Sequence, residues 1–138
     1  MRVKDLLQEK GMTVHTVPGD FSVLEAINFM AGENTSALIV ARGGHPLGIF
    51  TERDVMRCHL KHGEKAISEV NIQQAMTDKL IVAAPDDPVD KTLSLMIQTD
   101  IRHLPVAEEG KIIGMLSIRA LFQHYMTSLS AELESLTD

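Results

Sequence analysis

Apolar residues follow the helical period in some stretches of the chain and form short continuous runs in others. The helical period is clearest after Ser22, where the apolar positions are Val23, Ala26, Ile27 and Met30. Ser22 and Glu25 stand three positions apart at the start of this stretch, which predicts a capping box, and Gly32 is its expected end. The continuous apolar run over residues 36–41 predicts a strand that is buried on both faces.

The other elements of the first half follow from the same signals. A short connector over residues 64–70 and a helical segment around 71–77 are expected before the pattern restarts. Before them we predict a helix over 3–11 that stops at Gly11, a strand over 14–17, a hairpin loop over 42–46, an antiparallel return strand over 47–50, and a helix from Thr51 to about Lys61 that Gly63 ends.

The pattern then restarts at a constant offset of 66 residues. From Asp20 onward, this offset aligns identical residues without any insertion: Asp20 with Asp86, Val23 with Val89, Met30 with Met96, Leu38 with Leu104, Val40 with Val106, Gly48 with Gly114, and Arg53 with Arg119. The second half is therefore expected to hold a strand over 80–82, a helix with Asp87 as N-cap and Pro88 as first residue, strands over 102–107 and 112–116, and a helix from Ser117 to about Leu136.

The repeat also predicts the fold class. One half alone would bury its sheet poorly, so two halves should share a core. We expect an α/β (α+β) module of two pseudo-symmetric β-α-β-β-α repeats packed sheet to sheet, with two related clefts, one for each half.

Composition and charge exclude several classes of protein. The net charge of −6 disfavours a general nucleic-acid binder, and an aromatic content of 4% without Trp disfavours stacking on single strands. Cys58 is the only cysteine, so no intramolecular disulfide can form. No apolar run reaches the length of a membrane span and no signal-peptide core follows Met1, so a cytoplasmic protein without a membrane partner is expected.

The stretch over residues 48–54 carries the most informative polar residues. Thr51 follows the apolar end of a strand and Asp54 stands three positions later, at the start of a helix. One interpretation is a capping box that only stabilises the helix. The other is a ligand site, because a carboxylate can accept hydrogen bonds from two adjacent hydroxyl groups and a helix N-terminus attracts phosphate.

The second copy of this stretch, over residues 114–120, keeps the hydroxyl as Ser117 and replaces the acid by Ala120. If the acid binds a ligand, its loss removes a charge-assisted hydrogen bond of roughly 1.5–3 kcal/mol, and the second cleft should be weak or empty. The structural interpretation is that Ala120 is simply a good helix former.

Other polar residues have structural alternatives of equal simplicity. Arg102 can be a surface residue paired with Asp100 or with a helix acid, and His103 is better explained as a packed histidine than as a catalytic one. His59 and His62 lie three apart without a third metal ligand at useful spacing, so no metal site is predicted. No Ser-His-Asp arrangement, phosphate-binding glycine loop or pair of catalytic carboxylates is visible, so we expect no enzyme and no catalytic residues.

Taken together, these features resemble a tandem pair of CBS domains. The resemblance rests on the doubled element order, the ending at residues 48–54, the sequence Arg-His-Leu-Pro-Val at 102–106, and Met76-Thr77 before the second repeat. It covers about residues 1–124. It implies CBS repeats at 1–65 and 66–124 with a C-terminal helical extension at 125–138. It also implies a regulatory module that requires no cofactor and binds an adenine nucleotide (AMP, ADP or ATP).

The resemblance further implies where such a ligand would bind. The implied nucleotide site contains Ile49, Phe50, Thr51, Asp54, Lys79, Leu80, Ile81, Arg102, His103 and Pro105. Within it, Asp54 would accept from the ribose hydroxyls, while Thr51 and Arg102 would reach phosphate. The second, weaker cleft would be lined by Thr16, Ser36, Ala37, Met115 and Ser117. NAD or S-adenosylmethionine are the alternative ligands, and a structural dimerisation module without ligand is the alternative function.

The last helix carries a long apolar stripe that bears on oligomeric state. Its members are Leu121, Phe122, Tyr125, Met126, Leu129, Leu133 and Leu136. The stripe either folds back on its own core or pairs with the same helix of a second subunit, and its length beyond the motif favours the second. We therefore expect a homodimer, in line with the disks of four CBS domains that such pairs form, acting on an unidentified protein target.

Overall fold

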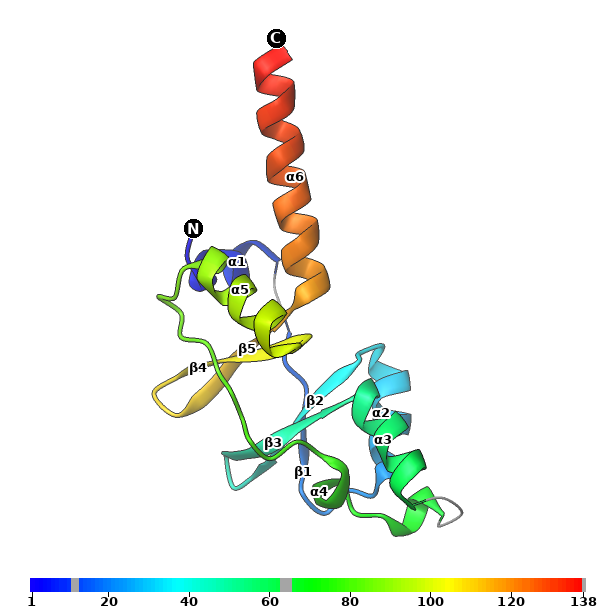
Figure 1. Cartoon of the computed structure of the whole chain (residues 1–138). Coiled ribbons are helices and arrows are strands. Elements are labelled where there is room, and N and C mark those ends of the chain that lie inside the picture. Colours follow the sequence, from blue (N-terminus) through cyan, green and yellow to red (C-terminus); the bar gives the residue numbers. More distant parts are fainter. Residues whose placement is uncertain (11–12, 63–65, 138) are drawn as a thin grey trace. The chain divides into compact units, whose positions relative to one another are not determined.

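The computed structural model describes residues 1–10, 13–62 and 66–137, and it is a mixed α/β structure with two sheets (Figure 1). Gly11 and Gly63, the predicted ends of two helices, lie outside the described residues. The chain forms two compact units. The first unit comprises Thr13–Ile81 with Glu109–Ile112, and the second comprises Val82–Glu108 with the residues before Thr13 and after Ile112.

The first unit is built on a three-stranded sheet in the order β1-β2-β3. Its strands are β1 (Thr16–Pro18), β2 (Ala37–Arg42) and β3 (His45–Thr51); β1 runs parallel to β2, and β3 runs antiparallel to it. Its helices are α2 (Val23–Glu33), α3 (Glu52–His62), the 3-10 turn η1 (Ile67–Glu69) and the single-turn α4 (Ile72–Ala75). The predicted capping box is confirmed, since Ser22 Oγ accepts from Glu25 N at 3.1 Å and Glu25 Oε1 accepts from Ser22 N at 3.0 Å.

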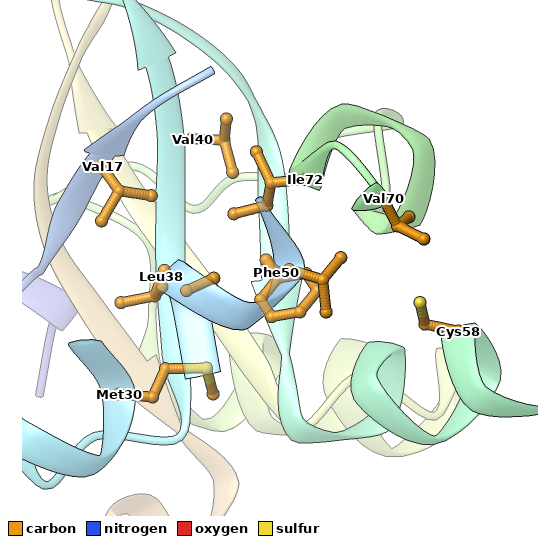
Figure 2. Packing of buried hydrophobic residues seen from close by; sticks show 10 residues of the cluster. Val17, Met30, Leu38, Val40, Phe50, Cys58, Val70 and Ile72 are labelled. Carbon is orange, nitrogen blue, oxygen red and sulfur yellow. The ribbon is translucent and has the colours of Figure 1, made fainter. Parts of the chain in front are cut away.

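The core of the first unit lies between its sheet and its helices. Figure 2 shows Phe50 and Leu38 of the sheet among Met30, Val70 and Ile72, all of which are buried. Cys58 of α3 also belongs to this core and points toward Val70. Burial raises the pKa of the Cys58 thiol, which fits a packing residue better than a reactive thiol.

The second unit contains α1 (Val3–Lys10), α5 (Val89–Thr99), β4 (His103–Glu108), most of β5 (Lys111–Ser117) and α6 (Ile118–Thr137). β4 and β5 form a two-stranded sheet. The duplication is visible at the C-terminal ends of two corresponding helices, α2 in the first unit and α5 in the second. Asn34 and Asp100, at the 66-residue offset, both adopt left-handed backbone angles (φ 52° and 55°) and donate their N–H groups to the last turn of α2 and α5.

Three local predictions are wrong, each for a physical reason. Gly32 lies inside α2, because the left-handed Asn34 ends the helix instead. Asp87 is not the N-cap of α5; Pro88 holds that position, and the Asp87 carboxylate accepts from Ala84 N at 2.8 Å. The segment 80–82 is not a strand, because only Ala83 forms a bridge, with Val106, before the turn at Pro85.

The N-terminal segment belongs to the second unit, although it stands at the start of the first sequence repeat. Residues 1–6 occupy there the place that residues 70–75 occupy in the first unit, at an offset of 69. The matched hydrogen bonds run from Val3 N to Asp87 O and from Ile72 N to Phe21 O (both 2.9 Å), and from Val89 N to Met1 O (3.1 Å) and Val23 N to Val70 O (2.8 Å). In each unit, therefore, a short helical segment comes from the other sequence repeat: residues 70–75 in the first unit and residues 1–6 in the second.

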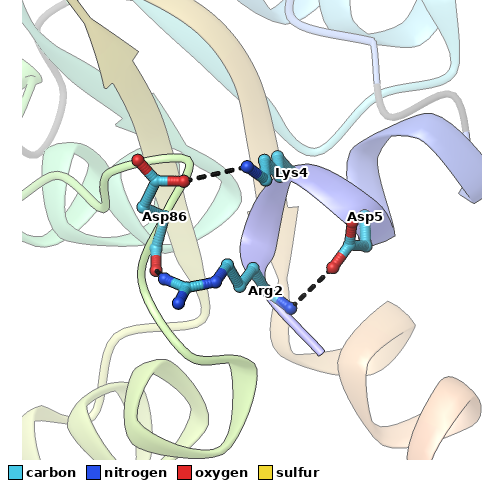
Figure 3. A network of polar contacts seen from close by, with 4 residues as sticks. All are labelled: Arg2, Lys4, Asp5 and Asp86. Carbon is cyan, nitrogen blue, oxygen red and sulfur yellow. Dashed lines mark hydrogen bonds and ion pairs between the residues drawn. The ribbon is translucent and has the colours of Figure 1, made fainter.

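Polar contacts hold this N-terminal segment in place (Figure 3). Lys4 Nζ lies 3.1 Å from Asp86 Oδ1, and Arg2 donates to the Asp86 carbonyl at 2.6 Å. The hydrogen bond and charge of Lys4 lower the pKa of the Asp86 carboxyl. Because the ion pair is solvent-exposed, its net contribution to stability is small, and the backbone hydrogen bonds fix the register.

Candidate functional site

The strand-to-helix turn at residues 51–54 has the same backbone in both units. β3 ends at Thr51 and α3 begins at Glu52, whose N–H donates to the Ser36 carbonyl at 3.2 Å. At the 66-residue offset, Ile118 N donates to the Arg102 carbonyl at 2.9 Å. The turn is therefore a feature of the fold, and any functional difference between the two copies comes from their side chains.

Asp54 is the side chain that distinguishes the first copy. It is only 3% exposed, and the structure brings three donors to its carboxylate. Thr51 N donates to Oδ2 at 3.0 Å, Thr77 Oγ1 donates to Oδ1 at 3.3 Å, and Arg57 Nη1 lies 3.6 Å from Oδ1. The bond from Thr51 N is the reach-back half of a capping box, which is the part of the structural interpretation that this structure supports. Sequence reasoning missed Thr77 and Arg57 as partners.

Burial governs the charge of Asp54. Desolvation raises the pKa of its carboxyl above the ordinary 3.8, and the hydrogen bonds from Thr51 and Thr77, with the nearby Arg57 charge, act in the opposite direction. A buried carboxylate with a raised pKa costs stability at neutral pH. Residues of this kind are more frequent at functional sites than elsewhere, which favours a role for Asp54 beyond capping.

The segment at Thr77 is fixed against the end of β3. Ile49 N donates to Thr77 O at 2.9 Å, and Thr77 N donates to Ile49 O at 2.8 Å. Gly48 is what allows this approach, because a Cβ at position 48 would lie 2.5 Å from Thr77 O. The pair of backbone bonds thus places the Thr77 hydroxyl beside Asp54.

The second copy lacks this arrangement. Ser117 Oγ accepts from Ala120 N at 3.1 Å, an ordinary capping bond, and Ala120 has no polar side chain. The other residues predicted for the second cleft lie in both units. Met115 belongs to β5, while Thr16, Ser36 and Ala37 lie in the first unit. Whether a ligand enters this second cleft stays a prediction.

The residues predicted for the first site also divide between the units. The first unit contains Thr51, Asp54, Ile49, Phe50, Lys79, Leu80 and Ile81, and the second contains Arg102, His103 and Pro105. Phe50 and Pro105 are buried. Lys79, Ile81 and Arg102 are exposed. The structure brings Thr51 and Asp54 together; the contribution of the β4 residues stays a prediction.

A metal site and a membrane-spanning helix are two further features to consider in the described residues. Within 1–10, 13–62 and 66–137, no three His, Cys, Asp or Glu side chains lie close enough to hold a metal ion. His62 Nε2 is buried without a hydrogen-bond partner, at the end of α3. None of the helices in these ranges combines the length and apolarity needed to cross a lipid bilayer.

Comparison with known proteins identifies the family. The sequence model of the CBS domain matches residues 3–61 and 67–127. The mitochondrial CBS domain-containing protein CBSX3 of Arabidopsis thaliana is 32% identical over 125 residues, which cover 84% of this chain and 60% of that protein. The present chain therefore spans 60% of the length of this relative.

Solved structures agree with the sequence comparison. The crystal structure of the CBS-domain containing protein ATU1752 from Agrobacterium tumefaciens has a TM-score of 0.85 and 32% identity, covering 91% of this chain and 99% of that one. The CBS domain pair of protein MJ0100, solved in complex with 5′-methylthioadenosine and S-adenosyl-L-methionine, has a TM-score of 0.80 over 93% and 98% of the two chains. At 21% identity this second likeness shows the fold alone. Since both halves match the CBS domain and the whole chain has the fold of solved CBS proteins, it belongs to the CBS-domain family as two CBS domains in tandem.

Proposed function

We propose that this CBS pair is a non-enzymatic regulatory module that binds an adenine nucleotide of the AMP, ADP or ATP class through Asp54. The observation that carries the proposal is the buried Asp54 carboxylate, which occurs in one copy of a duplicated turn and is absent from the other. The fold forms the same turn without an acid at Ala120, so Asp54 is not needed for the turn itself.

The proposed chemistry at Asp54 is recognition of ribose. An ionised carboxylate offers about four lone-pair sites on two oxygens, which suits two adjacent hydroxyl groups. Thr51, at the N-terminal end of α3, supplies a hydroxyl for phosphate, and Lys79 of the same unit adds a positive charge. Leu80 and Ile81 of the same unit offer apolar surface to a base.

The relatives support an adenosine-type ligand without fixing its identity. MJ0100, whose CBS pair shares this fold, was crystallised with 5′-methylthioadenosine and S-adenosyl-L-methionine, which both contain adenosine. S-adenosylmethionine and NAD therefore stay as alternatives to AMP, ADP and ATP for the present chain. The class of ligand that we propose is thus defined by the ribose diol and the adenine base.

Thermal-shift measurements on the wild-type protein test this function. A ligand that binds only the native state stabilises it by about 2.7 kcal/mol at a concentration of 100 Kd, so at least one of AMP, ADP, ATP, NAD and S-adenosylmethionine should raise the melting temperature. The matched control is 2′-deoxy-AMP, which lacks half of the diol and should give a smaller shift than AMP. If none of these ligands raises the melting temperature, the protein is better explained as a structural dimerisation module.

The C-terminal helix supports the proposed homodimer. Five apolar residues of α6 follow spacings of 4, 3, 4 and 3, which is the a/d pattern of a coiled-coil seam: Phe122, Met126, Leu129, Leu133 and Leu136. All five are between 39% and 83% exposed, and the second half of α6 extends beyond α1 and α5 (Figure 1). Only Leu121 of the predicted stripe packs in the core of its own unit. We propose that this seam pairs with the same helix of a second copy.

Replacing Leu129 by Glu at the centre of the seam is expected to convert the dimer into a monomer. The substitution puts a charge where two apolar side chains would meet, and light scattering coupled to gel filtration measures the resulting mass. Ala131→Glu adds the same charge on the opposite side of α6 and should leave the dimer intact. Equal masses for the wild type and the Leu129→Glu variant would reject the seam.

A further inference from the structure

The contact between Thr77 and Asp54 has a function that neither the capping box nor the family resemblance supplies. Thr77 is 23 residues away in sequence, yet its hydroxyl donates to Asp54 Oδ1 at 3.3 Å. Its position is set by the two backbone bonds to Ile49, not by its side chain. The fold therefore presents a hydroxyl donor to one specific oxygen of the carboxylate.

The acceptor sites on the two carboxylate oxygens of Asp54 suggest a role for the Thr77 hydroxyl. Thr51 N binds Oδ2 and Thr77 Oγ1 binds Oδ1, so each oxygen accepts one hydrogen bond from a fixed donor. The remaining partners are weaker or movable. Arg57 Nη1 is 3.6 Å away on a side chain that is 61% exposed, and the Thr51 side chain contributes the smallest of the favourable interactions. When these two turn away, one lone-pair site on each oxygen is left for a ligand.

We propose that Thr77 is a positioning residue for Asp54, whose hydroxyl orients the carboxylate so that each oxygen presents one free site to a vicinal diol. The inference rests on the proposed function of Asp54 and deepens it. It explains why the ligand must carry two adjacent hydroxyl groups.

The second unit provides an internal comparison. Residues 1–6 take the place of residues 70–75 there, so the position that corresponds to Thr77 at the offset of 69 is Gln8. Gln8 is exposed and lies within α1, which continues as a helix through Lys10, whereas the chain at Thr77 has left α4 and pairs with β3. The turn that lacks the acid, at Ala120, therefore also lacks the hydroxyl donor. The two residues occur together or not at all.

Three variants test the inference. Thr77→Val removes the hydroxyl and keeps the shape, and Thr77→Ser keeps the hydroxyl. Thr92→Val, in the second unit, removes a buried hydroxyl that donates to Pro88 O. Titration of the Asp54 carboxyl carbon by NMR is the first measurement, and calorimetry with AMP is the second. We expect the pKa of Asp54 to rise in Thr77→Val, because a donor to the charged form is lost, and to be unchanged in the other two variants.

The affinity for AMP should change in parallel. Loss of one intramolecular hydrogen bond should weaken AMP binding by about fivefold in Thr77→Val and leave it within about twofold in Thr77→Ser and Thr92→Val. An unchanged pKa of Asp54 in Thr77→Val overturns the inference, and so does an unchanged affinity. If the wild type binds no adenosine ligand, the proposed function fails, and the carboxyl titration still decides whether Thr77 orients Asp54. Should Thr77→Val not fold, Thr77→Ala provides the same comparison.

Discussion

Asp54→Asn is expected to abolish nucleotide binding and, at the same time, to raise the melting temperature of the protein. The amide keeps the size of the side chain but removes the negative charge and one acceptor oxygen. Binding should weaken by at least about a hundredfold, since hydrogen bonds to a charged acceptor contribute roughly 1.5–3 kcal/mol each, and the ribose would lose one of them outright and the charge assistance of the other. Isothermal titration calorimetry with AMP measures this loss.

The gain in stability follows from the raised pKa of Asp54. Between the ordinary value of 3.8 and the higher value in the folded protein, the folded state binds more protons than the unfolded chain. The contribution of Asp54 to stability therefore decreases as the pH rises through this window, and the cost is complete at neutral pH. Asn has no charge to desolvate, so we expect a higher melting temperature for this variant at pH 7. The difference should shrink as the pH falls toward 3.8.

Two further variants separate charge from shape. Asp54→Ala should also lose binding and keep the fold, since Ala120 shows that alanine is compatible with the same turn. Glu52→Gln removes an exposed acid from the first turn of the same helix and should change neither affinity nor stability. Unaltered AMP affinity in both Asp54 variants would show that the ligand binds elsewhere. A lower melting temperature for Asp54→Asn at pH 7 would show that the capping bond outweighs desolvation.

Gly48→Ala is expected to be the most destabilising single-methyl substitution in the first unit. The added Cβ would lie 2.5 Å from Thr77 O and 2.9 Å from Met76 Sδ. The carbonyl cannot move away easily, because Ile49 N holds it in a backbone hydrogen bond. We expect a loss of roughly 2–4 kcal/mol in the free energy of unfolding, measured by urea denaturation, and a weaker ligand site because Thr77 is displaced.

Two other glycines provide matched controls for this prediction. Gly114 is the counterpart of Gly48, but a Cβ there meets the flexible end of Leu7 at 2.8 Å, so Gly114→Ala should cost clearly less. Gly32 lies within α2, and a Cβ added there would meet no atom within 4 Å apart from its chain neighbours and the backbone of its own helix. Gly32→Ala should therefore stabilise the protein by about 0.5–1 kcal/mol. Equal losses for Gly48→Ala and Gly114→Ala would mean that the Thr77 carbonyl adapts and that its pairing with Ile49 is not rigid.

Much of the fold can be predicted from the sequence because the signals are local. The capping box of Ser22 and Glu25 depends on residues three positions apart, and the duplicated pattern reports the common architecture of the two halves. The same locality explains the errors. Residues 80–82 are apolar enough for a strand, but strand formation requires a partner, and only Ala83 has one. The 66-residue offset places Pro88 opposite Ser22, so it would have identified the correct cap of α5.

The site is predictable only in part for a related reason. Asp54 can be singled out because the comparison with Ala120 needs nothing but the sequence. Its partner Thr77 cannot, because their contact depends on how the chain after α4 pairs with β3. The place of residues 1–6 in the second unit is equally non-local, since Arg2 and Asp86 are 84 positions apart. Pairings of this kind depend on tertiary structure, and no periodicity in the sequence records them.

The place of residues 1–6 in the second unit implies an order of folding during synthesis. Residues 13–81 hold nearly everything that the first unit needs, so this unit can fold as soon as they have left the ribosome. The helix α1 is made earlier, but its backbone partners at Pro85, Asp87 and Val89 do not yet exist. We therefore expect α1 to stay without these hydrogen-bond partners while the first unit folds. The slow step in assembling the protein is therefore expected to be the return of α1 to the second unit, a loop closure across more than half of the chain.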